Sequence, residues 1–129
     1  PTGYVLIDGG KATTVSYISG TTPIPQDKPE IAAATAIAGQ QTGNTVIYLD
    51  CGSGALYPAH PNLIKKVKSQ LDVPLIVGGG IINQKQALEA FTAGADVVVV
   101  GNKLEEDPNF LDELVQAKKQ ATLVPTQIL

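Results

Sequence analysis

Residues 75–80 read Leu-Ile-Val-Gly-Gly-Gly, and residues 96–102 read Asp-Val-Val-Val-Val-Gly-Asn. Each stretch is a short aliphatic run that ends in glycine, which is the pattern of a buried strand followed by a tight turn. Two earlier runs, at 4–7 and 45–49, have a similar form. None of the four runs alternates cleanly between apolar and polar residues, so they predict the strands of a parallel sheet.

Helical patterns separate these strands. Alanines fill much of 31–38, and the preceding Asp27-x-x-Glu30 has the form of a capping box. Apolar residues recur at helical spacing over 63–71, and Asn83-x-x-Gln86 predicts the start of a helix that Gly94 ends. Asp107-Pro108 predicts the start of a last helix.

One unit of strand, loop and helix therefore repeats four times in 129 residues, which predicts an α/β fold. A TIM (β/α)8 barrel needs eight strands in typically about 250 residues. We expect this chain to supply about four βα units, as one domain over residues 1–129. A doubly wound sheet of the flavodoxin type would show the same alternation, and it stays open as an alternative at this stage.

Composition excludes several classes of protein. The chain has 9 Lys plus Arg against 12 Asp plus Glu and no basic stripe, so we expect no nucleic-acid partner. The apolar run at 97–100 is far shorter than the ~20 residues of a membrane-spanning helix, so we expect no integral membrane protein. The single cysteine, Cys51, favours an intracellular, cytoplasmic setting. The only histidine, His60, is expected in a surface loop.

The glycine-rich turns concentrate the candidate chemistry. Residues 78–80 and 101–102 follow consecutive strands, so both turns should meet at one edge of the sheet. Glycines there would let backbone N–H groups approach a phosphate, although they would also serve simply as tight turns. Residues 48–54 end at the same edge with a tyrosine, a carboxylate and a serine. Asp50 could accept a proton from a ligand hydroxyl that Tyr48 orients, or the two could be an ordinary aspartate in a turn and an ordinary tyrosine on a strand.

Three motifs resemble the geranylgeranylglyceryl phosphate synthase family, including its bacterial heptaprenylglyceryl relatives. They are Tyr-Leu-Asp-Cys-Gly-Ser-Gly-Ala at 48–55, Val-Gly-Gly-Gly-Ile at 77–81 and Val-Gly-Asn at 100–102. The resemblance runs almost from end to end, through further matching stretches at 1–4, 7–10, 17–19, 23–25 and 28–32.

This resemblance implies a TIM-barrel prenyltransferase that uses Mg²⁺. Such an enzyme transfers a polyprenyl group from its diphosphate to the primary hydroxyl of sn-glycerol 1-phosphate and forms an ether lipid precursor. Asp50 would be the catalytic base and Tyr48 would assist it, although the family usually has Glu at position 50. Tyr4 and residues 13–25 would lie along the prenyl groove. The residues expected to bind substrate are Tyr48, Leu49, Asp50, Cys51, Gly52, Ser53, Gly54, Gly79, Gly80, Gly101 and Asn102.

In this family the acidic metal ligands and a substrate-holding lysine come from the first strands of the barrel, which have no counterpart here. The chain is therefore expected to match strands five to eight, to hold no metal itself, and to pair with a second copy or with an N-terminal half-barrel. Lys11 could reach a diphosphate or could be an ordinary turn lysine. Two other functions stay open: a phosphosugar isomerase type of barrel, and a phosphate-binding half-barrel without catalysis.

Overall fold

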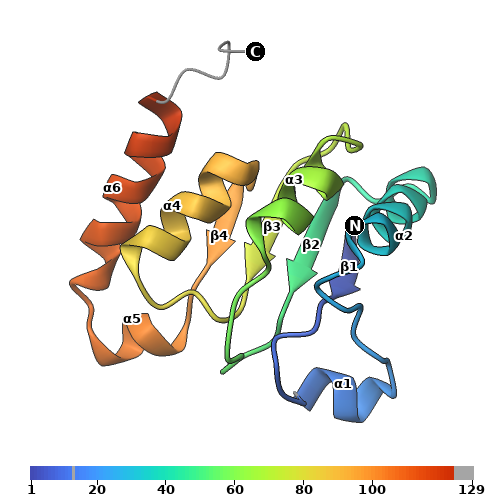
Figure 1. The fold of residues 1–129 in the computed structure, drawn as a ribbon, viewed down its shortest axis with the longest axis horizontal. Coiled ribbons are helices and arrows are strands. Elements are labelled where there is room, and N and C mark those ends of the chain that lie inside the picture. Colours follow the sequence, from blue (N-terminus) through green and yellow to red (C-terminus); the bar gives the residue numbers. More distant parts are fainter. Residues whose placement is uncertain (13, 124–129) are drawn as a thin grey trace.

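The structure is a computed structural model that describes residues 1–12 and 14–123. Its four strands form one sheet in the order β1-β2-β3-β4, and every neighbouring pair is parallel (Figure 1). The predicted α/β fold with a parallel sheet is thus confirmed. The strands are β1 (Thr2–Leu6), β2 (Val46–Asp50), β3 (Leu75–Gly78) and β4 (Val97–Val99).

A helix connects each strand to the next. The helices are α1 (Thr14–Ser19), α2 (Pro29–Gln41), α3 (Pro61–Lys68), α4 (Gln84–Ala93), α5 (Asn102–Glu106) and α6 (Phe110–Leu123). The sequence predicted neither α1 nor α5. These helices have 6 and 5 residues, which is too short for a helical repeat of apolar positions to be visible. Residue 13, the start of the predicted prenyl-groove segment, lies outside the described residues.

The predicted helix starts have mixed outcomes. Asn83 caps α4, because its side chain accepts a hydrogen bond from the Gln86 N–H at 2.8 Å. The predicted capping box over 27–30 is wrong: α2 begins one residue later than the box requires, and Lys28 stands at its N-cap without a side-chain hydrogen bond. His60 is exposed, as predicted, and it also caps α3 through Nδ1.

Helices α2, α3, α4 and α6 cover one face of the sheet, whereas α1 and α5 lie beyond the carboxyl ends of the strands (Figure 1). Val5, Leu49 and Val77 lie side by side in the sheet register, and all three are buried in the core formed with the helices. Because side chains alternate along a strand, residues one position before or after them point to the other face. The core cluster therefore fills the space between the sheet and the helices, and on the other face Leu6 is buried as well.

The opposite face of the sheet carries two rows of side chains. The first row is Tyr4, Tyr48, Ile76 and Val97, in register across the four strands. The second row is Leu6, Asp50, Gly78 and Val99. Tyr4 and Val97 are each 45% exposed, and Val99 is 43% exposed. We call this surface the open face.

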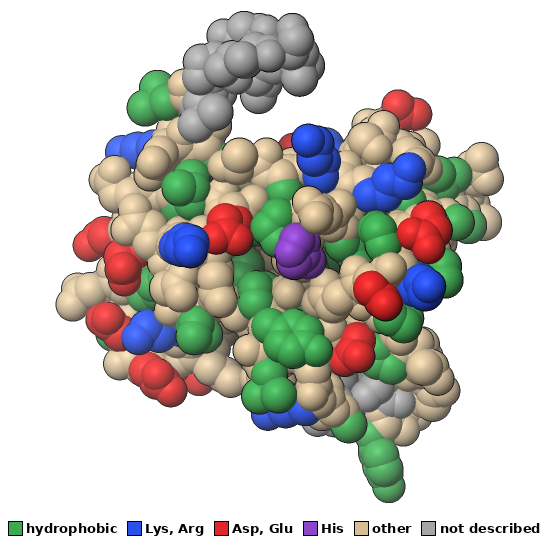
Figure 2. All heavy atoms as spheres, viewed as in Figure 1, with side chains coloured by type: hydrophobic (Ala, Val, Ile, Leu, Met, Phe, Trp, Pro, Cys, Tyr) green, Lys and Arg blue, Asp and Glu red, His purple; other side chains and the backbone are tan. Residues whose placement is uncertain are grey.

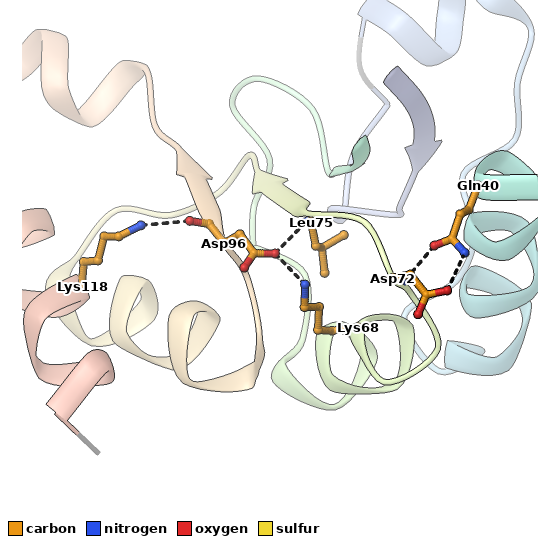
Figure 3. Close-up of polar contacts among 6 residues, drawn as sticks. All are labelled: Gln40, Lys68, Asp72, Leu75, Asp96 and Lys118. Atoms are coloured by element: carbon orange, nitrogen blue, oxygen red, sulfur yellow. Dashed lines mark hydrogen bonds and ion pairs between the residues drawn. The ribbon is translucent and has the colours of Figure 1, made fainter. Parts of the chain in front are cut away.

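Side-chain contacts tie the elements together at the amino ends of the strands (Figure 3). The Asp96 carboxylate, just before β4, accepts hydrogen bonds from Lys68 Nζ at 2.7 Å and from the Leu75 N–H at 2.8 Å. Lys118 Nζ donates to the Asp96 carbonyl oxygen at 2.9 Å. Partial burial acts to raise the pKa of Asp96, but the hydrogen bonds and the lysine charges outweigh it and lower that pKa.

Acidic and basic side chains are interspersed over the face of the molecule that Figure 2 shows. Within residues 1–12 and 14–123, no helix combines the length and the apolar character needed to cross a bilayer.

Candidate functional site

A cavity of about 300 Å³ lies at the carboxyl ends of β2, β3 and β4. Three consecutive strand ends contribute to it, because parallel strands finish at the same edge of the sheet. Eight of the eleven residues that the sequence assigned to the substrate line this cavity: Tyr48, Asp50, Ser53, Gly54, Gly79, Gly80, Gly101 and Asn102. The two glycine-rich turns are therefore brought together, as the order of the strands predicted.

The other three residues of that set do not line the cavity. Leu49 and Cys51 are fully buried on the helix-covered face, since they alternate with Tyr48 and Asp50 along the chain. Gly52 is buried, and its N–H is taken up by the Asp50 carboxylate at 2.7 Å. Their contact with substrate stays a prediction, and these three residues lie outside the lining of this cavity.

Glycines allow the loops around the cavity to pack backbone against backbone. A Cβ atom on Gly79 would lie 2.6 Å from the Gly52 carbonyl oxygen, and one on Gly80 would lie 2.6 Å from the Tyr57 carbonyl carbon. Gly79 and Gly80 also have positive φ angles of 86° and 79°. Both steric space and backbone conformation therefore require glycine at these two positions.

Tyr48 reaches across β3 towards the cavity. A Cβ atom on Gly78 would lie 2.5 Å from the Tyr48 hydroxyl oxygen, so this glycine makes room for the phenol. Burial raises the pKa of Tyr48, and the charge of Asp50 and the nearby Cys51 act in the same direction. The hydroxyl therefore stays protonated near neutral pH and can donate a hydrogen bond to a ligand.

Asp50 is held from two sides. Its Oδ2 accepts a hydrogen bond from the Tyr4 hydroxyl, and its Oδ1 accepts the Gly52 N–H. The Tyr4 ring meets the Tyr48 ring edge-on, with 5.6 Å between centroids. Burial, followed by the hydrogen bond to Asp50, raises the pKa of Tyr4, so Tyr4 is the proton donor in this pair. A carboxylate has about four lone-pair sites, so Asp50 keeps acceptor capacity for a ligand.

The sequence did not reveal that Tyr4 contacts Asp50, because 46 residues separate them and no local pattern joins a tyrosine on one strand to a carboxylate on another. It also missed Lys103, which lines the cavity. Lys11 lies at the rim: its Nζ is 3.3 Å from the point where a Cβ of Gly54 would lie. These two ammonium groups favour an anionic ligand.

The cavity has an apolar side as well. Four aliphatic residues line it together with the polar groups named above: Ile81, Ile82, Val99 and Val100. Within residues 1–12 and 14–123, no group of three or more His, Cys, Asp or Glu side chains is arranged to hold a metal ion. The arrangement suits a small ligand that carries hydroxyl groups and an anionic group.

Comparisons with known proteins agree on one family. The model of the PcrB family matches residues 1–119. A geranylgeranylglyceryl phosphate synthase of Spirosoma linguale is 51% identical over 120 residues, which cover 93% of this chain and 48% of that protein. One of Chitinophaga pinensis is 50% identical over 123 residues, which cover 95% of this chain and 49% of that protein.

A solved structure is similar as well. It is the (S)-3-O-geranylgeranylglyceryl phosphate synthase of Thermoplasma acidophilum, crystallised in complex with its substrate sn-glycerol-1-phosphate. Its TM-score is 0.86 at 35% identity, and the match covers 93% of this chain and 49% of that one. The chain thus spans about half the length of the relatives that it matches.

Proposed function

This chain belongs to the PcrB family, and from that premise we propose that it is the C-terminal half of a (β/α)8-barrel prenyltransferase. The reaction joins a polyprenyl group to the primary hydroxyl of sn-glycerol 1-phosphate. One observation carries the proposal: the strand ends bring Tyr48, Asp50 and the two glycine turns around a single cavity. The close relatives named as geranylgeranylglyceryl phosphate synthases support it.

In this proposal the phosphate lies against the backbone N–H groups at Gly79, Gly80 and Gly101, close to Asn102. Ser53 and Tyr48 bind the glycerol hydroxyls. A glycerol phosphate is small enough for a cavity of about 300 Å³. The aliphatic residues of the cavity lining, Ile81, Ile82, Val99 and Val100, would face the prenyl chain.

Asp50 acts as the general base. The primary hydroxyl oxygen attacks the allylic carbon of the prenyl diphosphate, a C–O ether bond forms, and the bond from that carbon to the diphosphate breaks. Asp50 takes the hydroxyl proton, and the electron pair of the broken bond leaves with the diphosphate. The hydrogen bonds from Tyr4 and Gly52 fix the carboxylate for this step.

Mg²⁺ would neutralise the charge of the leaving diphosphate when bound. Among the described residues, no three His, Cys, Asp or Glu side chains are grouped so that this chain alone could supply a full set of metal ligands. No step of the reaction is therefore assigned to a metal held by this chain. We propose that the ligands of the Mg²⁺ come from the half of the barrel that this chain does not supply.

The open face requires a partner in the same proposal. Four further βα units, or a second copy of this chain, would cover its exposed tyrosine and valines and would pair with the outer edge of β4 and with the part of the β1 edge that Ile24 does not already pair. Lys11, at the rim next to Gly54, would then face the diphosphate.

Calorimetry with the two enantiomeric glycerol phosphates tests the substrate site. We expect sn-glycerol 1-phosphate to bind at least about tenfold more tightly than sn-glycerol 3-phosphate, since the site fixes hydroxyls and phosphate together. Ser53→Ala should weaken that binding, whereas Ser69→Ala is the matched control, because the Ser69 hydroxyl donates to the Lys66 carbonyl oxygen away from the cavity.

A transfer assay with prenyl diphosphates tests the reaction itself. The chain would be assayed alone and together with the part of the Spirosoma linguale relative that it does not match. Ether product in the mixture that disappears with Asp50→Asn supports the proposed base. Tight binding without product in either sample would instead favour a non-catalytic phosphate-binding half-barrel, and preference for a phosphosugar would favour the isomerase type.

A further inference from the structure

Gln26 joins three loops at the carboxyl edge of the sheet, and we propose that it is a positioning residue for the glycerol-phosphate site. The inference rests on the function proposed above and adds a residue that does not touch the cavity. Gln26 lies between α1 and α2 and is half-buried. Its side chain reaches the loops that follow β1 and β2, and also the start of α3.

Each polar atom of the Gln26 carboxamide has a backbone partner. Nε2 donates to the Asp8 carbonyl oxygen at 3.0 Å and to the Pro58 carbonyl oxygen at 3.1 Å. Oε1 accepts the His60 N–H at 3.0 Å. Nε2 also lies 3.8 Å from Cys51 Sγ. One side chain thus contacts both ends of the loop over 51–60.

The loop held in this way forms one wall of the cavity. Ser53 and Gly54 lie between its two ends and line the cavity. Gly9 fixes the same loop from the side of β1, since its carbonyl oxygen accepts the Leu56 N–H at 2.8 Å. Because Gln26 also holds Asp8 next to Gly9, it connects the wall to the loop that supports it.

Only a neutral carboxamide matches these partners. Two carbonyl oxygens and one N–H group face the side chain, so it must offer two donor hydrogens and one acceptor. An ionised glutamate keeps the acceptor but has no hydrogen to donate to the carbonyl oxygens of Asp8 and Pro58. An apolar residue of the same size would leave three backbone groups without their partner, and unpaired groups are costly when buried.

Gln26→Glu tests the inference, and the chain contains a matched control. The Gln40 carboxamide also bridges a backbone N–H and a side-chain acceptor: Oε1 accepts the Asp72 N–H at 2.8 Å and Nε2 donates to Asp72 Oδ2 at 3.3 Å (Figure 3). This pair lies at the opposite end of the sheet from the cavity. Gln40→Glu therefore makes the same chemical change, next to acceptors, away from the site.

At neutral pH we expect Gln26→Glu to weaken binding of sn-glycerol 1-phosphate about tenfold, whereas Gln40→Glu lowers stability and leaves the affinity unchanged. At mildly acidic pH the affinity of Gln26→Glu, relative to wild type at the same pH, should recover in part, because a protonated carboxyl group donates one of the two hydrogens that the carboxamide supplies. Gln26→Asn, which keeps the amide on a shorter side chain, should give a smaller loss without the pH-dependent recovery.

Amide hydrogen exchange in the ligand-free chain provides a second measurement. Faster exchange at Gly52 and Gly54 in Gln26→Glu, but not in Gln40→Glu, supports the positioning role. Equal exchange and equal affinity in the two variants would overturn it. If the wild-type chain does not bind sn-glycerol 1-phosphate at all, the proposed function fails, while the exchange data still decide the role of Gln26.

Discussion

The Asp50 carboxylate is held in one orientation by two hydrogen bonds. An aspartate holds its carboxylate one methylene closer to the backbone than a glutamate would. The structure places the Tyr4 hydroxyl on one carboxylate oxygen and the Gly52 N–H on the other. A short side chain held at both oxygens has a fixed orientation, which favours proton transfer from a bound hydroxyl.

Cys51, the next residue along the chain, lies on the helix-covered face of the sheet instead of facing the cavity. Its thiol is fully buried. Burial, helped by the negative charge of Asp50, raises its pKa to about 12, although the hydrogen bond from Gln26 acts in the other direction. An unfolded chain would ionise this thiol near pH 8.5. Between these two values the folded state holds a proton that the unfolded state has lost.

Stability should therefore fall as pH rises above about 9, by up to about 1.4 kcal/mol per pH unit for this one group. We expect the difference in free energy of unfolding between wild type and Cys51→Ala to shrink between about pH 8 and pH 10, since the variant lacks the group. Urea denaturation at several pH values measures this. Parallel pH dependence of the two proteins, or rapid modification of the folded wild-type thiol, would contradict it.

The loops depend on glycine for two separate reasons, a positive φ angle and a lack of space for a Cβ atom. Gly80 combines a φ of 79° with backbone atoms of Tyr57 in the space where a Cβ would lie. Gly20 has a similar φ of 66°, but no described atom lies within 4 Å of such a Cβ. The two positions separate backbone strain from steric conflict.

Gly20→Ala should cost about 1 kcal/mol of unfolding free energy, from the left-handed backbone conformation alone. Gly80→Ala should cost about 1–3 kcal/mol more, because the loop over 51–60 must move. It should also weaken sn-glycerol 1-phosphate binding, since Gly80 lines the cavity. Urea denaturation and calorimetry on both variants measure these effects, and equal losses of stability would show that the loops do not pack as described.

The same elements explain what the sequence could predict. The strands and glycine turns at 75–80 and 96–102 could be predicted, because a buried parallel strand is a run of aliphatic residues and the turn after it begins with glycine. The short helix α5 could not, and neither could the partners of Gln26. Those partners lie 18 to 34 residues away along the chain, and they are backbone atoms that every residue type offers. Most of the residues that line the cavity could therefore be predicted, whereas the side chain that holds its loop in place could not.

At the scale of the whole molecule, the sheet is covered on one side only. Tyr4, Val97 and Val99 are between 43% and 45% exposed on the open face. The two valines belong to β4, whose outer edge is not paired with any described strand. Exposed apolar side chains beside an unpaired strand edge favour association. In the proposed function this face is where the remaining half of a barrel, or a second copy, binds.

The isolated chain should accordingly sediment as a dimer or a larger species. Val97→Glu should shift it towards the mass of a single chain, because a carboxylate on the open face opposes apolar contact. Leu56→Glu is the matched control, since Leu56 is 67% exposed but lies in a loop outside the sheet. A wild-type chain that sediments as a monomer at micromolar concentration would disprove this arrangement.

The amino and carboxyl ends of the strands are joined by different means. Ion pairs and amide contacts, such as those of Asp96 and Gln40, connect the first, whereas close approach of backbones at Gly79 and Gly80, together with the Gln26 carboxamide, connects the second. A pair of side chains can be exchanged for another pair, but a backbone contact has no substitute. Substitutions among the side-chain contacts at the amino ends should therefore change stability while leaving the geometry of the cavity intact, whereas substitutions at Gly79 or Gly80 should change both.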